Sequence, residues 1–299
     1  EEIALAKKNL GWEYDEEFYV PEEVKENCRK YCEEGKKAYD KWNDMFNEYC
    51  SKFPDMAEKW NIYFSDELPV DLLNDEDFWT YEGDMATRAS SEKVLNKLSK
   101  VIPNLFGGSA DLGPSNKSVM KDREYYSPEN PSGSNIHFGI REFAMTAMAN
   151  AISLHGGLRP YIAGFFVFSD YMKAGMRLSA LMEQPVISIL THDSIGVGED
   201  GPTHQPIEHL AALRSMPGYT VIRPCDTHET AAAWYLALTR KQPTGIVLSR
   251  QTLPLLKETG KDALKGAYIL QNCDGKPDII LMATGSEVEL IYKAYDILT

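Results

Sequence analysis

Residues 191–206, THDSIGVGEDGPTHQP, contain two histidines and three acids directly after the apolar run 185–190. A short apolar run that ends in a glycine-rich loop predicts a buried parallel strand. Ligands of open α/β sheets bind beyond the carboxyl ends of such strands. Imidazoles and carboxylates placed there can bind hydroxyl groups or move protons. We therefore expect His192, Asp200 and His204 to belong to a functional site. No metal site is predicted, because no third ligand follows at a short regular spacing.

Two further segments carry groups that bind phosphate. The loop 107–116, GGSADLGPSN, contains Ser109, Asp111 and Ser115, and loops of this kind offer backbone amide and serine hydroxyl donors, although they also simply form turns. Arg88 and Arg250 are the cations best placed to assist, because arginine binds phosphate in a bidentate manner. Surface ion pairs are the alternative for both arginines.

Glu142 begins a predicted helix after the short strand 135–139, where a carboxylate is favoured by the helix N-terminus. The alternatives are a capping acid and a carboxyl group bonded to a buried ligand nitrogen. Phe165, Phe168 and Tyr171 follow another strand, and they predict either core packing or the wall of a site for a flat heteroaromatic ligand.

The segment 196–201 matches the pattern G-x-G-x-x-G formally. Dinucleotide binding requires this pattern to open a helix whose amides face a pyrophosphate. Here Glu199 and Asp200 would repel a pyrophosphate, and Pro202 removes an amide donor. We therefore exclude a dinucleotide-binding loop.

Composition limits the classes of partner. The chain of 299 residues carries a net charge of −14, which argues against non-specific binding to nucleic acid or an anionic membrane. No apolar stretch approaches the ~18 residues of a transmembrane helix. Five cysteines do not suggest a disulfide framework, so we expect a cytoplasmic protein.

Strands alternate with helices from about residue 84 to residue 249, which predicts an α/β fold with a doubly wound, mostly parallel sheet. Residues 1–63 predict helices, and 64–81 predict a linker. We expect Cys28 and Cys32 to be half-buried cysteines rather than metal ligands. Residues 278–287 predict a strand, a turn and a helix start. Both ends of the chain fall within helical patterns, so we expect a fragment of a longer polypeptide.

Taken together, these segments resemble transketolase. GGSADLGPSN, FGIREFAM, the three aromatic residues, THDSIGVGEDGPTHQP and LSRQTLP occur in the order and spacing of that family. The resemblance implies a tail of the diphosphate-binding domain with a helical N-terminal connecting arm (1–82), a complete pyrimidine-binding (Pyr) domain (83–256), and a linker with the truncated start of a C-terminal domain (257–299).

The resemblance also implies a mechanism that uses thiamine diphosphate. Glu142 would hydrogen-bond the aminopyrimidine N1′ from a shielded position, and His204 would assist proton transfer. The cofactor would be bound by Asp111, Leu112, Glu142, Phe165, Phe168 and Tyr171. The sugar phosphate would be bound by Arg88, Ser115, His192, Asp200, His204 and Arg250. The implied reaction transfers a two-carbon glycolaldehyde unit from xylulose 5-phosphate to ribose 5-phosphate, in the pentose phosphate pathway.

The implied enzyme is larger than this chain. The family binds the diphosphate through Mg²⁺ (or Ca²⁺), and the G-D-G segment that carries this metal is absent here. The complete site forms in a homodimer, between the Pyr domain of one subunit and the diphosphate-binding domain of the other. We therefore expect a half-site that is inactive alone. The alternatives are another thiamine-dependent transferase, such as deoxyxylulose-phosphate or dihydroxyacetone synthase, and a non-catalytic interaction subunit of a split enzyme.

Overall fold

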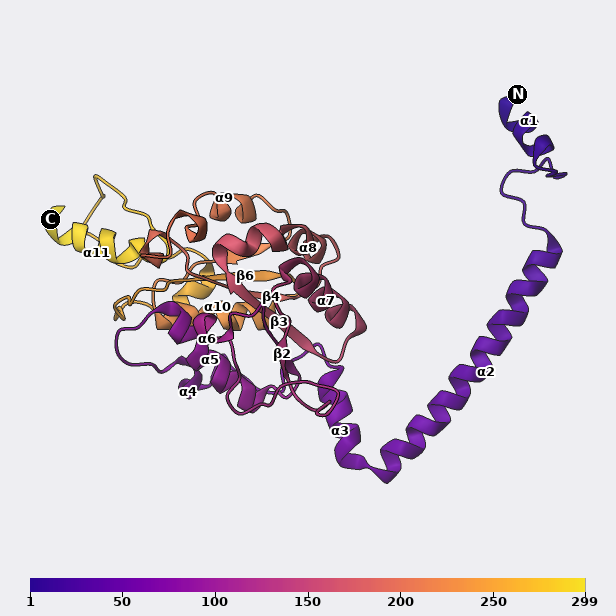
Figure 1. Cartoon of the computed structure of the whole chain (residues 1–299), viewed down its shortest axis with the longest axis horizontal. Coiled ribbons are helices and arrows are strands. Elements are labelled where there is room, and N and C mark those ends of the chain that lie inside the picture. Colours follow the sequence, from indigo (N-terminus) through magenta and orange to yellow (C-terminus); the bar gives the residue numbers. More distant parts are fainter. Residues whose placement is uncertain (299) are drawn as a thin grey trace. The chain divides into compact units, whose positions relative to one another are not determined.

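A six-stranded parallel sheet forms the centre of the domain that contains the predicted site (Figure 1). The computed structural model describes residues 1–298. The strand order is β2-β1-β3-β4-β6-β5, and every neighbouring pair is parallel. The strands are β1 (Leu105–Ser109), β2 (Asn135–His137), β3 (Arg159–Phe165), β4 (Ile187–Thr191), β5 (Thr220–Ile222) and β6 (Thr244–Leu248). The predicted parallel α/β sheet is confirmed.

Side chains alternate between the two faces of each central strand, and both faces are buried. In β4, Ile187 and Ile189 contribute to one apolar cluster and Leu190 to the other. The same alternation separates Ile246 from Val247 in β6. Strands buried on both faces read as nearly continuous apolar runs, which is why these segments could be located in the sequence.

Helices cover both faces of the sheet, so the sheet is doubly wound. Figure 1 shows α5 (Thr87–Val101) and α10 (Thr227–Thr239) on one side, and α7 (Glu142–His155), α8 (Ser169–Leu181) and α9 (His209–Arg214) on the other. Trp234 of α10 is fully buried and donates its indole N–H to Ser91 of α5. Asp226 caps α10, because its carboxylate accepts from the Glu229 amide.

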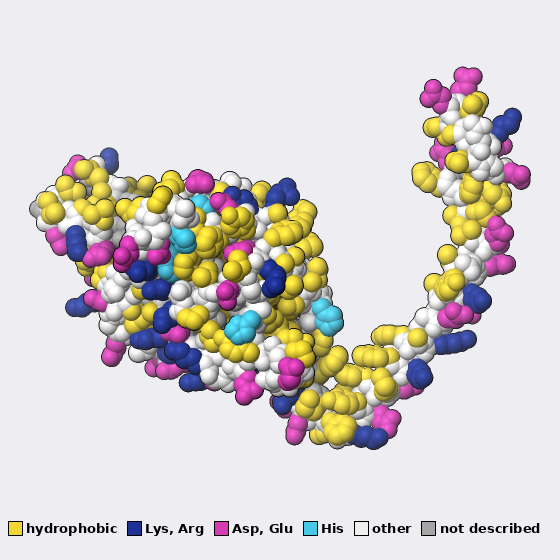
Figure 2. Space-filling view, viewed as in Figure 1, with side chains coloured by type: hydrophobic (Ala, Val, Ile, Leu, Met, Phe, Trp, Pro, Cys, Tyr) yellow, Lys and Arg dark blue, Asp and Glu magenta, His cyan; other side chains and the backbone are white. Residues whose placement is uncertain are grey.

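The chain divides into two compact units, and the first comprises Glu1–Lys59. It contains α1 (Glu2–Asn9) and α2 (Glu22–Lys52), neither of which has a buried residue. Hydrophobic side chains are exposed along this unit (Figure 2). Cys28 and Cys32 are exposed as well, so the expectation that they are half-buried is wrong. Within residues 1–298, no helix is long and apolar enough to cross a membrane.

The second unit begins at Trp60 and includes the segment 64–81. This segment is not a simple linker, because Leu72 and Phe78 are buried in the same cluster as α5 and α10. It contains the short helix α4 (Glu76–Trp79), which Asp75 caps by accepting from two amides. Leucine and phenylalanine spaced among acids and turn residues gave no periodic signal, so their burial was missed.

Residues 278–286 do not form the predicted strand. They precede α11 (Glu287–Leu298) without pairing to another strand in the described chain, and Ile280 and Met282 are exposed. A strand of this composition requires a neighbouring strand to satisfy its amides and carbonyls. No strand within residues 1–298 pairs with this segment, so its apolar pattern alone does not make it a strand.

Candidate active site

The sheet reverses its direction of growth at β1, because β2 lies on one side of β1 and β3 on the other. Ligands of open α/β sheets bind at such a reversal, outside the carboxyl ends of the strands. The pairing register places the end of β3 opposite the end of β4, with Phe165 beside Thr191. Thr191 in turn lies beside Leu248 of β6. The loops that follow β1, β3, β4 and β6 therefore leave the sheet at one edge, and they carry most of the predicted residues.

His192 lies at the centre of this group. It follows β4 directly and adopts a left-handed backbone conformation, with φ of 64°. Only 3% of the residue is exposed, and its ring lies 3.8 Å from that of Phe165, centroid to centroid. Burial, and then the positive charge of Arg88, lower the pKa of His192 to about 4. The imidazole is therefore neutral at physiological pH.

Arg88 connects α5 to the loop after β1 and to His192. Its Nη1 donates to the carbonyl oxygen of Ser115 at 2.7 Å and approaches His192 Nε2 at 3.5 Å. Burial, and then the charge of Arg250, lower the pKa of Arg88. Arg250 is exposed and lies beside Gly198 of the glycine-rich loop. A Cβ atom added at Gly198 would lie 3.7 Å from Arg250 Nη1. The structure thus brings together four residues predicted to bind the sugar phosphate.

An aromatic wall, defined here as Phe165, Phe168 and Tyr171, borders the same edge. The rings of Phe165 and Phe168 are stacked at 5.9 Å, with an angle of 4° between their planes. Tyr171 continues the row at 6.3 Å from Phe168, and 65% of it is exposed. Core packing therefore does not explain Tyr171. His204 meets Phe168 edge to face at 5.4 Å, which places the second histidine at this wall.

The two predicted acids near this edge are accessible. Asp200 is exposed, and its negative charge acts on His192 against the larger effects of burial and Arg88. Glu142 is the first residue of α7 and is half-buried. Its backbone carbonyl accepts from Thr146, while its carboxyl group has no hydrogen-bond partner within residues 1–298. The carboxyl group is therefore available to a ligand, but this chain alone does not shield it.

Asp111 and Leu112 occupy the loop that also contains Ser115. Asp111 is exposed, with φ of 62°, and the amide of Leu112 donates to Ser109 Oγ at 2.8 Å. The Leu112 carbonyl oxygen accepts from the Asn116 amide at 2.8 Å, and the Asn116 side chain is hydrogen-bonded to Thr191 beside His192. The loop that carries Asp111 and Leu112 is therefore joined to the group around His192 through Asn116.

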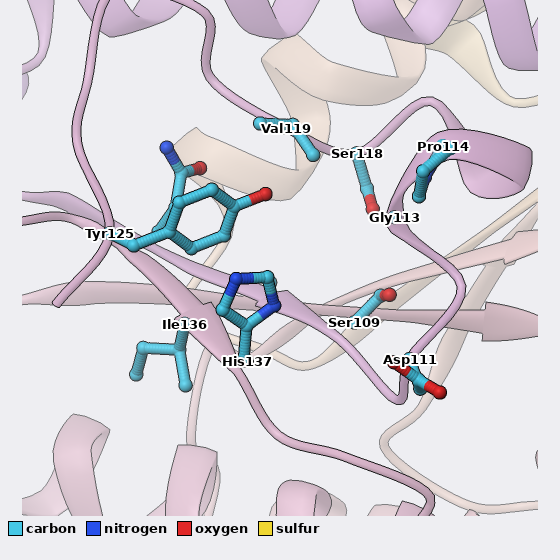
Figure 3. Close-up of a pocket in the computed structure, with 11 residues that line it drawn as sticks. Ser109, Asp111, Gly113, Pro114, Ser118, Val119, Tyr125, Ile136 and His137 are labelled. Carbon is cyan, nitrogen blue, oxygen red and sulfur yellow. The ribbon is translucent and has the colours of Figure 1, made fainter. Parts of the chain in front are cut away.

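Asp111 instead lines a separate cavity of about 310 Å³ at the ends of β1 and β2 (Figure 3). The rings of Tyr125 and His137 stack on one side of this cavity, with centroids 3.9 Å apart. Ser118 also lines it, and its buried hydroxyl has no partner in the part of the chain that the structure describes. Sequence reasoning did not single out Tyr125, His137 or Ser118.

Sequence reasoning also missed two sets of residues that contact the predicted ones. Thr191 and Asn116 are buried and hydrogen-bonded to each other beside His192. Asp193 pairs with Arg223 in a buried ion pair. Each of these four residues is next in sequence to a predicted site residue or lies at the end of a predicted strand. That position was the only sign in the sequence that could have pointed to them.

One further cluster, which includes the residue before Tyr171, has the residue types of a metal site. Asp170, Glu208 and His209 place possible ligand atoms within 4.8 Å of one another. However, Lys173 contacts Asp170 at 3.0 Å, and His209 approaches the same carboxylate at 3.2 Å. These cationic or hydrogen-bonding neighbours already satisfy Asp170.

Comparison with known families matches three consecutive segments. Residues 83–255 match the family described as "Transketolase, pyrimidine binding domain". Residues 1–69 match "Transketolase, thiamine diphosphate binding domain". Residues 266–299 match "Transketolase-like TK C-terminal domain".

Similar proteins cover the whole chain. The transketolase of Halalkalibacterium halodurans is 46% identical over 303 residues, which are 100% of this chain and 46% of the relative. That of Bacillus subtilis is 47% identical over 98% of this chain and 45% of its own length. The structure of Pichia stipitis transketolase with sedoheptulose-7-phosphate superposes with a TM-score of 0.91 at 39% identity, over 98% of this chain and 44% of that one. The chain spans about half the length of the curated relatives it matches. On this similarity, the chain belongs to the transketolase family.

Proposed function

We propose that this chain supplies the Pyr half of a thiamine diphosphate site in a transketolase. The enzyme would transfer a two-carbon glycolaldehyde unit from xylulose 5-phosphate to ribose 5-phosphate. One observation carries this proposal: two arginines, two histidines and the aromatic wall meet at the point where the sheet reverses its direction of growth. This combination offers a flat apolar surface beside two cationic side chains.

The residues at this edge fit the pyrimidine end of the cofactor. Tyr171 and Phe168 present ring surface that the chain itself does not cover, which suits stacking with a flat heteroaromatic ring. Glu142 would hydrogen-bond N1′ of the aminopyrimidine through its unpartnered carboxyl group, and Asp111 and Leu112 would contact the cofactor from the loop after β1. Thiamine diphosphate, when bound, supplies the carbanion chemistry needed to break and form a carbon–carbon bond beside a carbonyl group.

The polar residues fit a sugar phosphate. Arg88 and Arg250 would bind the phosphate with charge-assisted hydrogen bonds, together with Ser115 and His192. Asp200 is exposed and would accept a hydrogen bond from a sugar hydroxyl. His204 stands at the edge of the aromatic wall, where it would hold or release a proton near the reacting carbon.

A second subunit would complete the proposed thiamine diphosphate site. We propose that Mg²⁺ (or Ca²⁺) and the diphosphate bind to a diphosphate-binding domain of a second subunit in a homodimer. Exposed apolar side chains on α7 support such an interface: Phe143 is 54% exposed and Leu154 is 57% exposed. Isolated exposed apolar residues are common, but several on one helix mark an interaction surface.

The test is ketol transfer from xylulose 5-phosphate to ribose 5-phosphate with thiamine diphosphate and Mg²⁺. The chain is assayed alone and then mixed with a separately produced transketolase diphosphate-binding domain. We expect activity in the mixture only. Glu142→Gln should abolish that activity, whereas Glu129→Gln, at an exposed glutamate outside the site, should retain it.

Three outcomes contradict the proposal. Turnover by the chain alone would show that it binds diphosphate and metal by other residues. An active mixture that prefers pyruvate with glyceraldehyde 3-phosphate, or formaldehyde as acceptor, would assign another thiamine-dependent transferase. Formation of a stable complex without any turnover would instead favour a non-catalytic interaction subunit.

A further inference from the structure

Three buried groups form a hydrogen-bonded chain that ends at His192. Thr191 Oγ1 lies 2.7 Å from Asn116 Oδ1 and 2.9 Å from His192 Nδ1. Asn116 and Thr191 are fully buried, and His192 is nearly so. Water therefore cannot replace either partner of the threonine hydroxyl, so the protons in this chain must be distributed among the three side chains.

A threonine hydroxyl has a single proton to donate. Thr191 donates it to the Asn116 carbonyl oxygen, so the Thr191 oxygen can only accept from His192. Nδ1 of His192 must therefore carry a proton. The hydrogen bond made by one imidazole nitrogen decides the protonation of the other in a neutral ring. Nε2 is left with a lone pair, which faces Arg88 Nη1 at 3.5 Å.

The charged groups around the ring favour its neutral form. Arg88 of α5 and Arg250 after β6 are positive, His204 lies in the same loop, and Asp200 is the facing acid that opposes them. Burial has the largest effect, and the net result is a pKa of about 4. At pH 7 the imidazole thus carries one N–H, and its position decides whether Nε2 donates or accepts.

We propose that Thr191 and Asn116 are positioning residues that hold His192 as the Nδ1–H tautomer and present Nε2 as a hydrogen-bond acceptor. Neutral His192 then accepts from Arg88 and adds no third positive charge beside the two arginines. Neither Thr191 nor Asn116 would contact the substrate, so both would act through His192.

The Nδ1–H tautomer of His192 affects phosphate binding, and this effect rests on the proposed function. A phosphate dianion offers only acceptor oxygens, and an Nε2 lone pair cannot bond to them. Nε2 can meet the phosphate in two balanced ways: it gains a proton from solvent, or it accepts the P–OH proton of the monoanion. Both complexes hold one proton more than the free dianion and the neutral ring together. Binding should therefore weaken as pH rises above the second phosphate pKa of about 6.

The chain contains a matched control. Thr203 Oγ1 lies 2.9 Å from His204 Nδ1, which repeats the Thr191–His192 contact in an exposed position. The hydroxyl of Thr203 has no second side-chain partner within residues 1–298, so it is free to donate to Nδ1 or to accept from it. His204 should therefore exchange between tautomers, whereas His192 should not.

Long-range ¹H–¹⁵N correlation NMR of the whole chain, labelled with [¹⁵N]histidine, tests the tautomer directly. The His192 signals are assigned by their loss in His192→Gln. At pH 7.5 we expect a protonated Nδ1 and an unprotonated Nε2 for His192. Thr191→Val should remove this preference, Thr191→Ser should restore it, and Thr203→Val should leave His192 unchanged. If Thr191→Val does not fold, the wild-type spectrum and Thr191→Ser still decide.

Two results would overturn the inference: a protonated Nε2 in the wild-type chain, or a Thr191→Val spectrum with the wild-type tautomer. A titration with inorganic phosphate then separates this inference from the proposed function. Lack of any response at His192 would contradict the phosphate site and leave the tautomer assignment intact. Binding that tightens as pH rises would contradict the proton uptake, even with the Nδ1–H tautomer present.

Discussion

The Arg223 guanidinium holds the Asp193 carboxylate through Nε and Nη2, each at 2.7 Å from Oδ2, and both side chains are buried. Asp193 directly follows His192, so this pair fixes the backbone on the far side of the left-handed residue. Arg223 also contacts the Thr284 carbonyl, Ser286 and Glu287. The residues just before and at the start of α11 are thereby joined to the loop that carries the candidate site.

Replacing Arg223 should destabilise the fold strongly. Burial raises the pKa of Asp193 despite the attraction of Arg223, so the carboxylate is costly to bury without its partner. Arg223→Met should lower the free energy of unfolding by about 3–5 kcal/mol, as measured by urea denaturation. The control is Lys241→Met, which removes the exposed pair with Asp66 and should cause no measurable change.

The double variant Arg223→Met, Asp193→Leu sharpens this test. Removal of both charges leaves no unpaired buried ion, so much of the lost stability should return. A double variant as unstable as Arg223→Met alone would mean that the loss reflects packing of the arginine side chain and not the unpaired carboxylate.

His192 should make stability depend on pH between about 4 and 6.5. Its pKa in the folded chain is about 4, below the 6.5 of a free side chain, so the unfolded state binds more protons in this window. Stability due to neutral His192 is therefore complete above pH 6.5 and declines as the pH falls towards 4. The free energy of unfolding, measured with urea from pH 4.5 to 7.5, should rise less steeply with pH in His192→Gln than in the wild-type chain. An equal reduction in His155→Gln, at an exposed histidine, would contradict the assignment to His192.

Much of this architecture could be predicted because its elements have strong local patterns. The strand at 185–190 is an apolar run, and the helix predicted to begin at Glu142 does begin at that residue. The side chains beyond adjacent strand ends then had to converge, because parallel strands end at one edge. Residues 192, 200 and 204 could be chosen for that reason.

The rest depended on contacts between distant segments. Asn116 lies 75 residues from Thr191, and Asp193 lies 30 residues from Arg223. Neither pair has a sequence spacing that indicates contact. The burial of Leu72 and Phe78 likewise depends on α5 and α10, and the absence of a strand at 278–286 reflects the lack of a neighbouring strand. Local patterns do not report such tertiary effects.

Arg88 and Arg250 should discriminate phosphorylated from unphosphorylated sugars. In the complemented assay, Arg250→Ala should raise the KM for xylulose 5-phosphate by roughly 10- to 150-fold, since a charge-assisted hydrogen bond contributes about 1.5–3 kcal/mol. The KM for unphosphorylated xylulose should change little. Arg240→Ala provides the control at an exposed arginine outside the site. An equal rise in KM for both sugars would place the effect of Arg250 elsewhere than the phosphate.

The aromatic wall should separate into a structural and a functional member. Phe165 is buried, so Phe165→Ala should cost about 3–5 kcal/mol of folding stability in the chain alone. Tyr171 is largely exposed, and Tyr171→Ala should change that stability by less than about 0.5 kcal/mol.

In the complemented enzyme, Tyr171→Ala should instead raise the thiamine diphosphate concentration for half-maximal activity by about 2- to 12-fold, because ring stacking contributes about 0.5–1.5 kcal/mol. Tyr126→Ala serves as the control at an exposed tyrosine. A Tyr171 variant with unchanged cofactor requirement would remove Tyr171 from the proposed pyrimidine site, whereas a Phe165 variant that folds with wild-type stability would contradict the buried position of the ring.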